Sequence, residues 1–149
     1  MRFDPANEIL RKFLRHDEDV VSVSPVSGGC ISRAFHLRVK NGDDQIRDLF
    51  VKTNHSEFES NFRAESDGLQ AIHAAGVIRV PEPIGLSKTA ETVALAMEWI
   101  EPSTPTPHYH SDFGTRLATL HRVTSKDDDA HGWSSDNFLG ASPQLNSPA

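Results

Sequence analysis

The sequence predicts an α+β domain in which an antiparallel sheet packs against one long helix. Apolar residues suggest strands near 20–26, 31–39 and 49–51, and those of the second segment, Ile31, Phe35, Leu37 and Val39, alternate with the period of two expected of a half-buried strand. From about Glu57 the period becomes that of a helix, which Gly76 is expected to close. A continuous apolar run at 93–97 then predicts a buried strand.

The composition fits one globular domain and excludes several classes of protein. The chain has 149 residues, 37% of them hydrophobic and 24% charged. No apolar run approaches the ~20 residues of a transmembrane helix, and the N-terminus lacks the charged-then-apolar pattern of a signal peptide. We therefore expect a cytoplasmic protein with no membrane partner. A net charge of −6 argues against nucleic acid as a partner, and the one cysteine excludes an internal disulfide.

The remaining elements follow in order along the chain. Asp4 as cap and Pro5 at the first helical position predict an N-terminal helix up to about His16. After the strand at 93–97, a proline-rich linker leads to a last helix opened by Ser111 or Asp112. These boundaries divide the chain into a small lobe at 1–101, a linker at 102–110 and the beginning of a second lobe at 111–149.

The residues that carry chemistry lie on these predicted elements in a particular order. Gly28 and Gly29 lie between two strands, where a turn with bare backbone N–H groups can hold phosphate oxygens. Lys52 ends a strand and could neutralise phosphates, and Glu65 on the helix could hold the lysine by an ion pair. Each alone has an ordinary alternative: a hairpin turn, a surface lysine and a surface carboxylate. Their joint order favours the small lobe of a kinase, which binds ATP.

A hinge-like segment follows the buried strand. Glu98, Trp99 and Ile100 come directly after the apolar run, and an extended connection there can offer N–H and C=O groups to the edge of an adenine. The alternative is a strand that simply leaves the core.

Several stretches resemble the fructosamine kinase family, the ketosamine 3-kinases that include protein-ribulosamine 3-kinases. The resemblance rests on Gly28-Gly29-Cys30-Ile31-Ser32-Arg33-Ala34-Phe35, Phe50-Val51-Lys52, Phe62-Arg63-Ala64-Glu65, Val80-Pro81-Glu82-Pro83, the segment 117–122, and Asp136-Asn137-Phe138-Leu139-Gly140 with Pro143-Gln144 and Asn146. It implies a kinase-like fold close to the aminoglycoside phosphotransferases, with ATP and Mg²⁺ as cofactors. It also implies phosphorylation of the 3-hydroxyl of ketoamines, on glycated proteins or small ketosamines, after which the adduct leaves the protein.

The resemblance also assigns roles to individual residues. It implies a phosphate loop, an ion pair and an adenine-contacting hinge, formed respectively by Gly28, Gly29 and Cys30, by Lys52 and Glu65, and by Glu98, Trp99 and Ile100.

The chain departs from the family where the catalytic loop should follow. The family's His-Gly-Asp loop, its downstream Asn and its metal-binding Asp do not occur, so we expect no catalytic residue and no metal ligand here. Asp112-Phe113-Gly114 and His131-Gly132-Trp133 only imitate such motifs, and we interpret Asp112 as a helix cap. The chain is expected to be the N-terminal part of a longer enzyme, inactive alone. Its last helix would belong to a truncated large lobe and would expose Phe113, Leu117 and Leu120.

Cys30 is a candidate redox-sensitive thiol. Loop N–H groups and Lys52 would favour its thiolate, whose oxidation could block ATP or link two chains by a disulfide. The alternative is a small residue that fits the turn. Three other functions stay open for the whole chain: another small-molecule kinase of the aminoglycoside or choline type, a non-catalytic nucleotide-binding fragment, and a non-functional truncated product.

Overall fold

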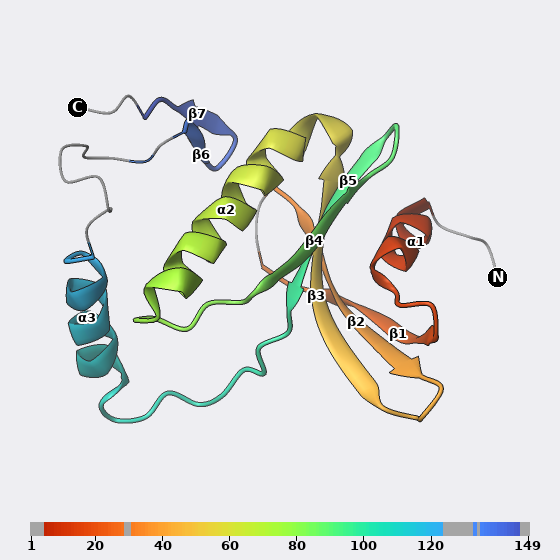
Figure 1. The fold of residues 1–149 in the computed structure, drawn as a ribbon, viewed down its shortest axis with the longest axis horizontal. Helices are drawn as coiled ribbons and strands as arrows, with labels where there is room; N and C mark the ends of the chain where they lie inside the picture. The colour runs from red at the N-terminus through yellow and green to blue at the C-terminus, as the bar shows by residue number, and fades with distance from the viewer. Residues whose placement is uncertain (1–4, 29–30, 124–132, 134, 147–149) are drawn as a thin grey trace.

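A five-stranded antiparallel sheet forms the centre of the molecule (Figure 1). The computed structural model describes residues 5–28, 31–123, 133 and 135–146. The strand order is β1-β2-β3-β5-β4, and every neighbouring pair is antiparallel. The strands are β1 (Glu18–Val26), β2 (Arg33–Asn41), β3 (Ile46–His55), β4 (Pro83–Lys88) and β5 (Thr92–Glu98). The predicted α+β class and its antiparallel sheet are confirmed.

Helices cover both faces of the sheet (Figure 1). On one face lies α1 (Pro5–Leu10) with the short 3-10 helix η1 (Arg11–Phe13), and on the other lies α2 (Glu59–Ala75), preceded by η2 (Ser56–Phe58). The predicted end of α2 is confirmed, because Gly76 follows it with a left-handed φ of +66° and donates its N–H to the His73 carbonyl.

The two faces carry two separate clusters of buried side chains. Ile9 and Leu10 of α1 pack against the first cluster, which also contains Leu37, Val39, Leu49, Val51, Ala94 and Ala96. Phe62 of α2 packs on the second, with Val93, Leu95 and Met97. Because successive residues of a strand point to opposite faces, β5 contributes to both clusters and is buried along 93–97, as its apolar run predicts.

The C-terminal part contains α3 (Tyr109–Leu120) and a hairpin of β6 (Asn137–Leu139) with β7 (Ser142–Gln144). The expected opening of α3 at Ser111 or Asp112 is wrong: the helix begins at Tyr109 with His108 as its N-cap residue. Asp112 lies in the first turn instead, where its N–H donates to the His108 carbonyl and its carboxylate complements the helix dipole.

The apolar residues of α3 are largely uncovered. Phe113 and Leu117 are 43% and 36% exposed, which agrees with the expectation for this helix, and Leu120 is half-buried. Among the helices that the structure describes, none is long and apolar enough to cross a membrane. The proposed cap Asp4 lies outside the described residues.

Candidate functional site

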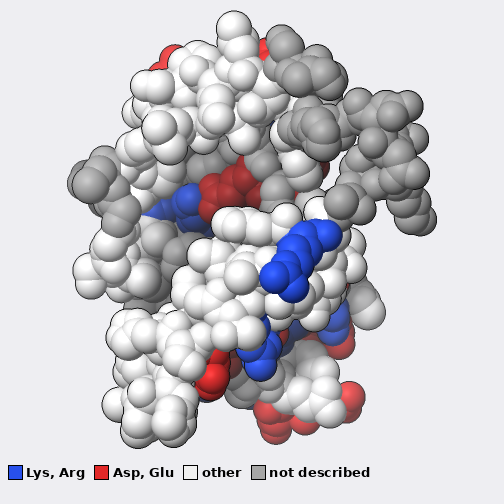
Figure 2. Space-filling view, turned by 90° about the vertical axis from the view of Figure 1, so that its left-hand side faces the viewer, with Lys and Arg blue, Asp and Glu red and all other residues white. Residues whose placement is uncertain are grey.

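A hollow on one face of the molecule holds a basic and an acidic group against each other (Figure 2). The structure brings the sequence-predicted pair Lys52 and Glu65 together: the Lys52 Nζ lies 2.8 Å from Glu65 Oε1 and 2.6 Å from Oε2. The two side chains keep 26% and 33% of their surface exposed, so the pair is partly shielded and still accessible. The ammonium also lies 5.6 Å from the centre of the Phe62 ring, a favourable cation–π distance.

Two periodicities in the sequence produce this pairing. Leu49 and Val51 of β3 belong to the cluster under α1, so Lys52, one position on, points to the opposite face. On α2, Glu65 follows the buried Phe62 by three residues, which places both side chains on the helix face toward the sheet.

Gly28 lies in the connection between β1 and β2. Its φ of +117° is a conformation that L side chains rarely adopt, so glycine is required at this point of the chain. The other predicted members of the phosphate loop, Gly29 and Cys30, lie outside the described residues.

A pocket of about 460 Å³ opens between Gly28 and the ion pair. Its lining also includes Ile31, Ser32, Ala34 and Phe50. The volume is within the range of small-molecule sites, ~300–1,000 Å³. A charged group at one end and an apolar sheet surface beside it suit a ligand that is anionic at one end and aromatic at the other.

The β6–β7 hairpin walls a second pocket, of about 360 Å³, that adjoins the same ion pair. Asn61 of α2 donates its Nδ2 to the Gly140 carbonyl at 3.3 Å, which links the helix to the hairpin turn. Asn146 closes the base of the hairpin through bonds to Asp136 Oδ1 and the Ser135 carbonyl, at 2.9 and 3.0 Å. Asp136, Gly140 and Asn146 thus take part in bonds that hold a hairpin, which the sequence analysis did not predict.

The predicted hinge residues lie at the end of β5. The N–H of Glu98 donates to the Glu82 carbonyl at 2.8 Å, and the Glu98 carboxylate pairs with Arg79 at 2.6 Å. The next residue, Trp99, lies 6.3 Å from the Phe50 ring, centroid to centroid, so its indole extends along the sheet face that carries Lys52. Ile100 follows and is half-buried.

Sequence reasoning missed His36 on β2. The rings of His36 and Trp99 stack with centroids 3.8 Å apart and planes at 12°. The His36 Nε2 lies 2.6 Å from Asp48 Oδ1, and the Arg38 Nε lies 3.0 Å from the same oxygen. The alternation in β2 could have placed His36 on the Lys52 face, but no local pattern identifies Trp99 or Asp48 as its neighbours.

Charged contacts fix the first turn of α2 beside β4. The Glu59 carboxylate accepts hydrogen bonds from Lys88 at 2.7 Å and from Arg63 at 2.6 Å. These bonds, that from Lys88 most strongly, lower the pKa of Glu59.

Among the residues that the structure describes, no group of three or more His, Cys, Asp or Glu side chains could hold a metal ion.

The sheet, the long helix across it and the strand lysine paired with a helix glutamate define the small lobe of a kinase-like fold. A crystal structure described as a fructosamine-3-kinase from Haemophilus somnus has the same fold, with a TM-score of 0.80 over 95% of this chain and 47% of that one, at 23% identity. A family model for fructosamine kinase matches residues 4–149. The chain belongs to the fructosamine kinase family.

Curated relatives agree with this membership. A probable ketoamine kinase from Synechocystis is 36% identical over 81% of this chain and 39% of its own length. A chloroplastic protein-ribulosamine 3-kinase from Arabidopsis thaliana is 32% identical over 85% of this chain and 37% of its own length. The chain therefore spans less than half the length of these relatives.

Proposed function

We propose that this chain is the ATP-binding lobe of a kinase that phosphorylates ketoamines, either ribulosamines or fructosamines, on glycated proteins or small molecules. The observation that carries the proposal is the Lys52–Glu65 ion pair at the 460 Å³ pocket. The ketoamine kinases among its relatives support the class of acceptor. Phosphorylation of the sugar 3-hydroxyl would destabilise the adduct, so the whole protein would act in cytoplasmic protein deglycation.

Each residue of the site has a distinct task in this proposal. Lys52 neutralises phosphate oxygens as a point charge, and Glu65 limits the movement of its flexible side chain. Gly28 leaves the backbone free to approach the phosphates, together with Gly29 and Cys30. The Glu98 N–H already donates to Glu82, so Glu98 would contact the base through its carbonyl, whereas Trp99 and Ile100 would offer the other backbone groups of the hinge. Bound ATP with Mg²⁺ supplies the phosphoryl group.

We also propose that this chain binds nucleotide without transferring phosphate. Its 149 residues contain no His-Gly-Asp sequence. Phosphoryl transfer depends on positioning of the acceptor hydroxyl and the metal, and these groups are not assigned to any residue here. Incubation with ATP and a glycated peptide should leave the peptide unphosphorylated, whereas phosphorylated product would refute this part.

Calorimetric titration with Mg-ATP tests the nucleotide site. Lys52→Ala should raise the Kd by about tenfold or more, because a charge-assisted hydrogen bond contributes about 1.5–3 kcal/mol. The matched control is Lys40→Ala, which removes the same charge from a 46% exposed side chain paired with Asp44. If the two variants bind Mg-ATP equally well, the assignment of Lys52 is wrong.

Cys30 stays a predicted redox-sensitive thiol. If it lies in the phosphate loop, Mg-ATP should slow its alkylation, and mild oxidation should produce a disulfide-linked dimer that a reductant converts back to monomer. Equal alkylation rates with and without Mg-ATP would show that Cys30 does not lie in the nucleotide site.

A further inference from the structure

We propose that Trp99 and Phe50 form an aromatic wall against which the base of the nucleotide packs, and that His36 is the positioning residue that holds Trp99 in place. The inference rests on the proposed function, because Phe50 lines the proposed nucleotide pocket and Trp99 lies beside Phe50. It adds side-chain contacts with the base to the backbone hydrogen bonds that the hinge would supply.

The direction of the bound nucleotide follows from the residues around Lys52. Towards the C-terminal end of β3, the Asn54 Nδ2 donates to the Ile31 carbonyl at 3.0 Å and to Ser32 Oγ at 3.3 Å. The residues that lead into β2 therefore cover this side of Lys52. In the other direction Phe50 lies two residues along β3, about 6.6–6.8 Å from Lys52 on the same face. With its phosphates at Lys52, a nucleotide extends its base towards Phe50.

The strand register continues this surface. His36 lies directly opposite Phe50 in the β2–β3 pairing, and Met97 of β5 lies opposite it on the other side. Trp99 follows two residues after Met97, and its ring contacts both aromatic neighbours, at centroid distances of 3.8 Å to His36 and 6.3 Å to Phe50. A base that reaches Phe50 therefore meets the indole as well. Aromatic surfaces favour a planar heteroaromatic ring.

Trp99 is fixed before any ligand arrives. The Trp99 Nε1 donates to Glu101 Oε2 at 2.8 Å, and His36 stacks on one face of the indole. His36 is in turn bonded to Asp48, and these two side chains are only 23% and 30% exposed. Because the ring orientation is already set, little conformational entropy is lost when a base packs on it.

A purely structural role of His36 makes a different prediction from this one. If the stack only stabilised the sheet, its loss would affect every ligand of the folded chain equally. If it positions a base-binding wall, its loss affects ligands with a base and spares those without one. Inorganic tripolyphosphate has the phosphates of ATP and no base, so the pair of ligands separates the two roles.

The experiment measures the Kd values of Mg-ATP and Mg-tripolyphosphate by calorimetry on the full chain and its variants. His36→Ala should raise the Kd of Mg-ATP by about threefold to tenfold, the range of one aromatic contact, and leave the Kd of Mg-tripolyphosphate unchanged. His36→Phe retains a stacking ring and should keep the ATP affinity. His16→Ala is the matched control, because the His16 side chain is 97% exposed.

The outcomes separate this inference from the proposed function. Suppose that Lys52→Ala weakens the binding of both ligands, and that His36→Ala weakens the binding of neither or of both equally. The aromatic wall is then refuted, and the proposed nucleotide site at Lys52 stands. If the wild-type chain binds neither ligand, the proposed site fails as well. If His36→Ala does not fold, Asp48→Ala replaces it. Loss of the Asp48 carboxylate removes the hydrogen bond that holds the His36 ring, so this variant should bind Mg-ATP more weakly and Mg-tripolyphosphate equally well. Unchanged ATP affinity would overturn the inference.

Discussion

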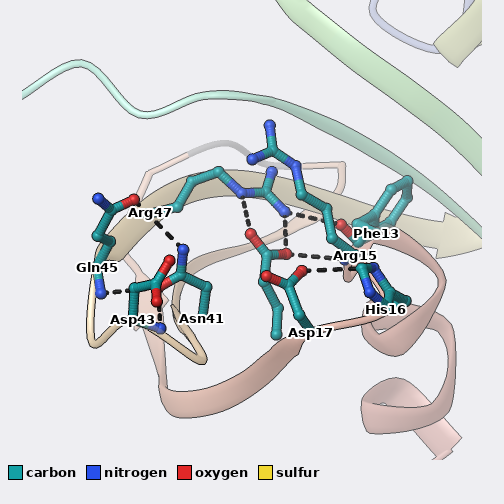
Figure 3. A network of polar contacts seen from close by, with 9 residues as sticks. Phe13, Arg15, His16, Asp17, Asn41, Asp43, Gln45 and Arg47 are labelled. Atoms are coloured by element: carbon teal, nitrogen blue, oxygen red, sulfur yellow. Dashed lines mark hydrogen bonds and ion pairs between the residues drawn. The ribbon is translucent and has the colours of Figure 1, made fainter.

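The ion pair between Glu18 and Arg47 joins the N-terminal segment to the sheet. Figure 3 shows Arg47 reaching from the sheet towards Phe13 and Arg15 of that segment. Glu18 is only 8% exposed, and Arg47 donates from Nε and Nη2 to its two carboxylate oxygens at 2.8 and 2.5 Å. The same carboxylate accepts the Arg15 N–H at 2.8 Å, and Arg47 also donates to the Phe13 carbonyl at 3.1 Å. One buried carboxylate therefore connects the chain after η1, the start of β1 and β3.

Glu18→Gln removes the charge and keeps the size of this side chain. Breaking a buried ion pair from one side costs about 3–5 kcal/mol, because the other charge remains buried without its partner. Arg47 keeps 23% of its side chain exposed and can recover some hydration, so we expect the lower end, about 3 kcal/mol. At about 2–4 °C per kcal/mol for a chain of this size, the Tm should fall by about 6–12 °C.

Urea and thermal unfolding, followed by circular dichroism, measure this loss. The matched control is Asp17→Asn, because the neighbouring Asp17 side chain is 43% exposed and contacts only the exposed His16 in the ion pairs described. The control should change stability by no more than about 0.5 kcal/mol. Equal unfolding midpoints for Glu18→Gln and Asp17→Asn would refute the reasoning.

Two further predictions concern the same sheet. The bond from Arg47 outweighs burial and lowers the pKa of Glu18 below its unfolded value of about 4.5, so this contribution to stability is present above that pH and is lost as the pH falls through the folded pKa. Urea midpoints of the wild type and Glu18→Gln should therefore converge in acid; a gap that is constant from pH 7 to pH 3 would exclude this linkage. Leu37→Ala should cost about 2–5 kcal/mol, because Leu37 is 0% exposed in the cluster under α1. The control Val21→Ala, at a 53% exposed position of β1, should stay close to wild type in thermal unfolding, and similar losses for both would contradict the assigned core.

The elements that the sequence predicted are those with a local physical cause. The apolar run at 93–97 indicated a strand with no solvent-facing side, and β5 is buried on both faces. Gly76 indicated the end of α2, because a left-handed residue there costs glycine no steric strain. Lys52 and Glu65 could be expected to meet because each lies on a predictable face of a predictable element.

Other features depend on contacts that no local pattern contains. The start of α3 was misplaced because Asp112 is a good cap by residue type, while the helix begins at Tyr109 without a side-chain cap. The hairpin at 137–144 has strands of three residues, too short for a clear periodicity.

The sequence by itself determined the class of the fold, the order of its elements and the faces on which Lys52 and Glu65 lie, because these follow from side-chain periods of two and 3.6 residues. Only the tertiary structure decided that Trp99 packs on His36 and that Glu18 pairs with Arg47, 29 residues away. Such partners are chosen by strand register and helix packing, which are set by the burial of the whole core and not by neighbours in the chain.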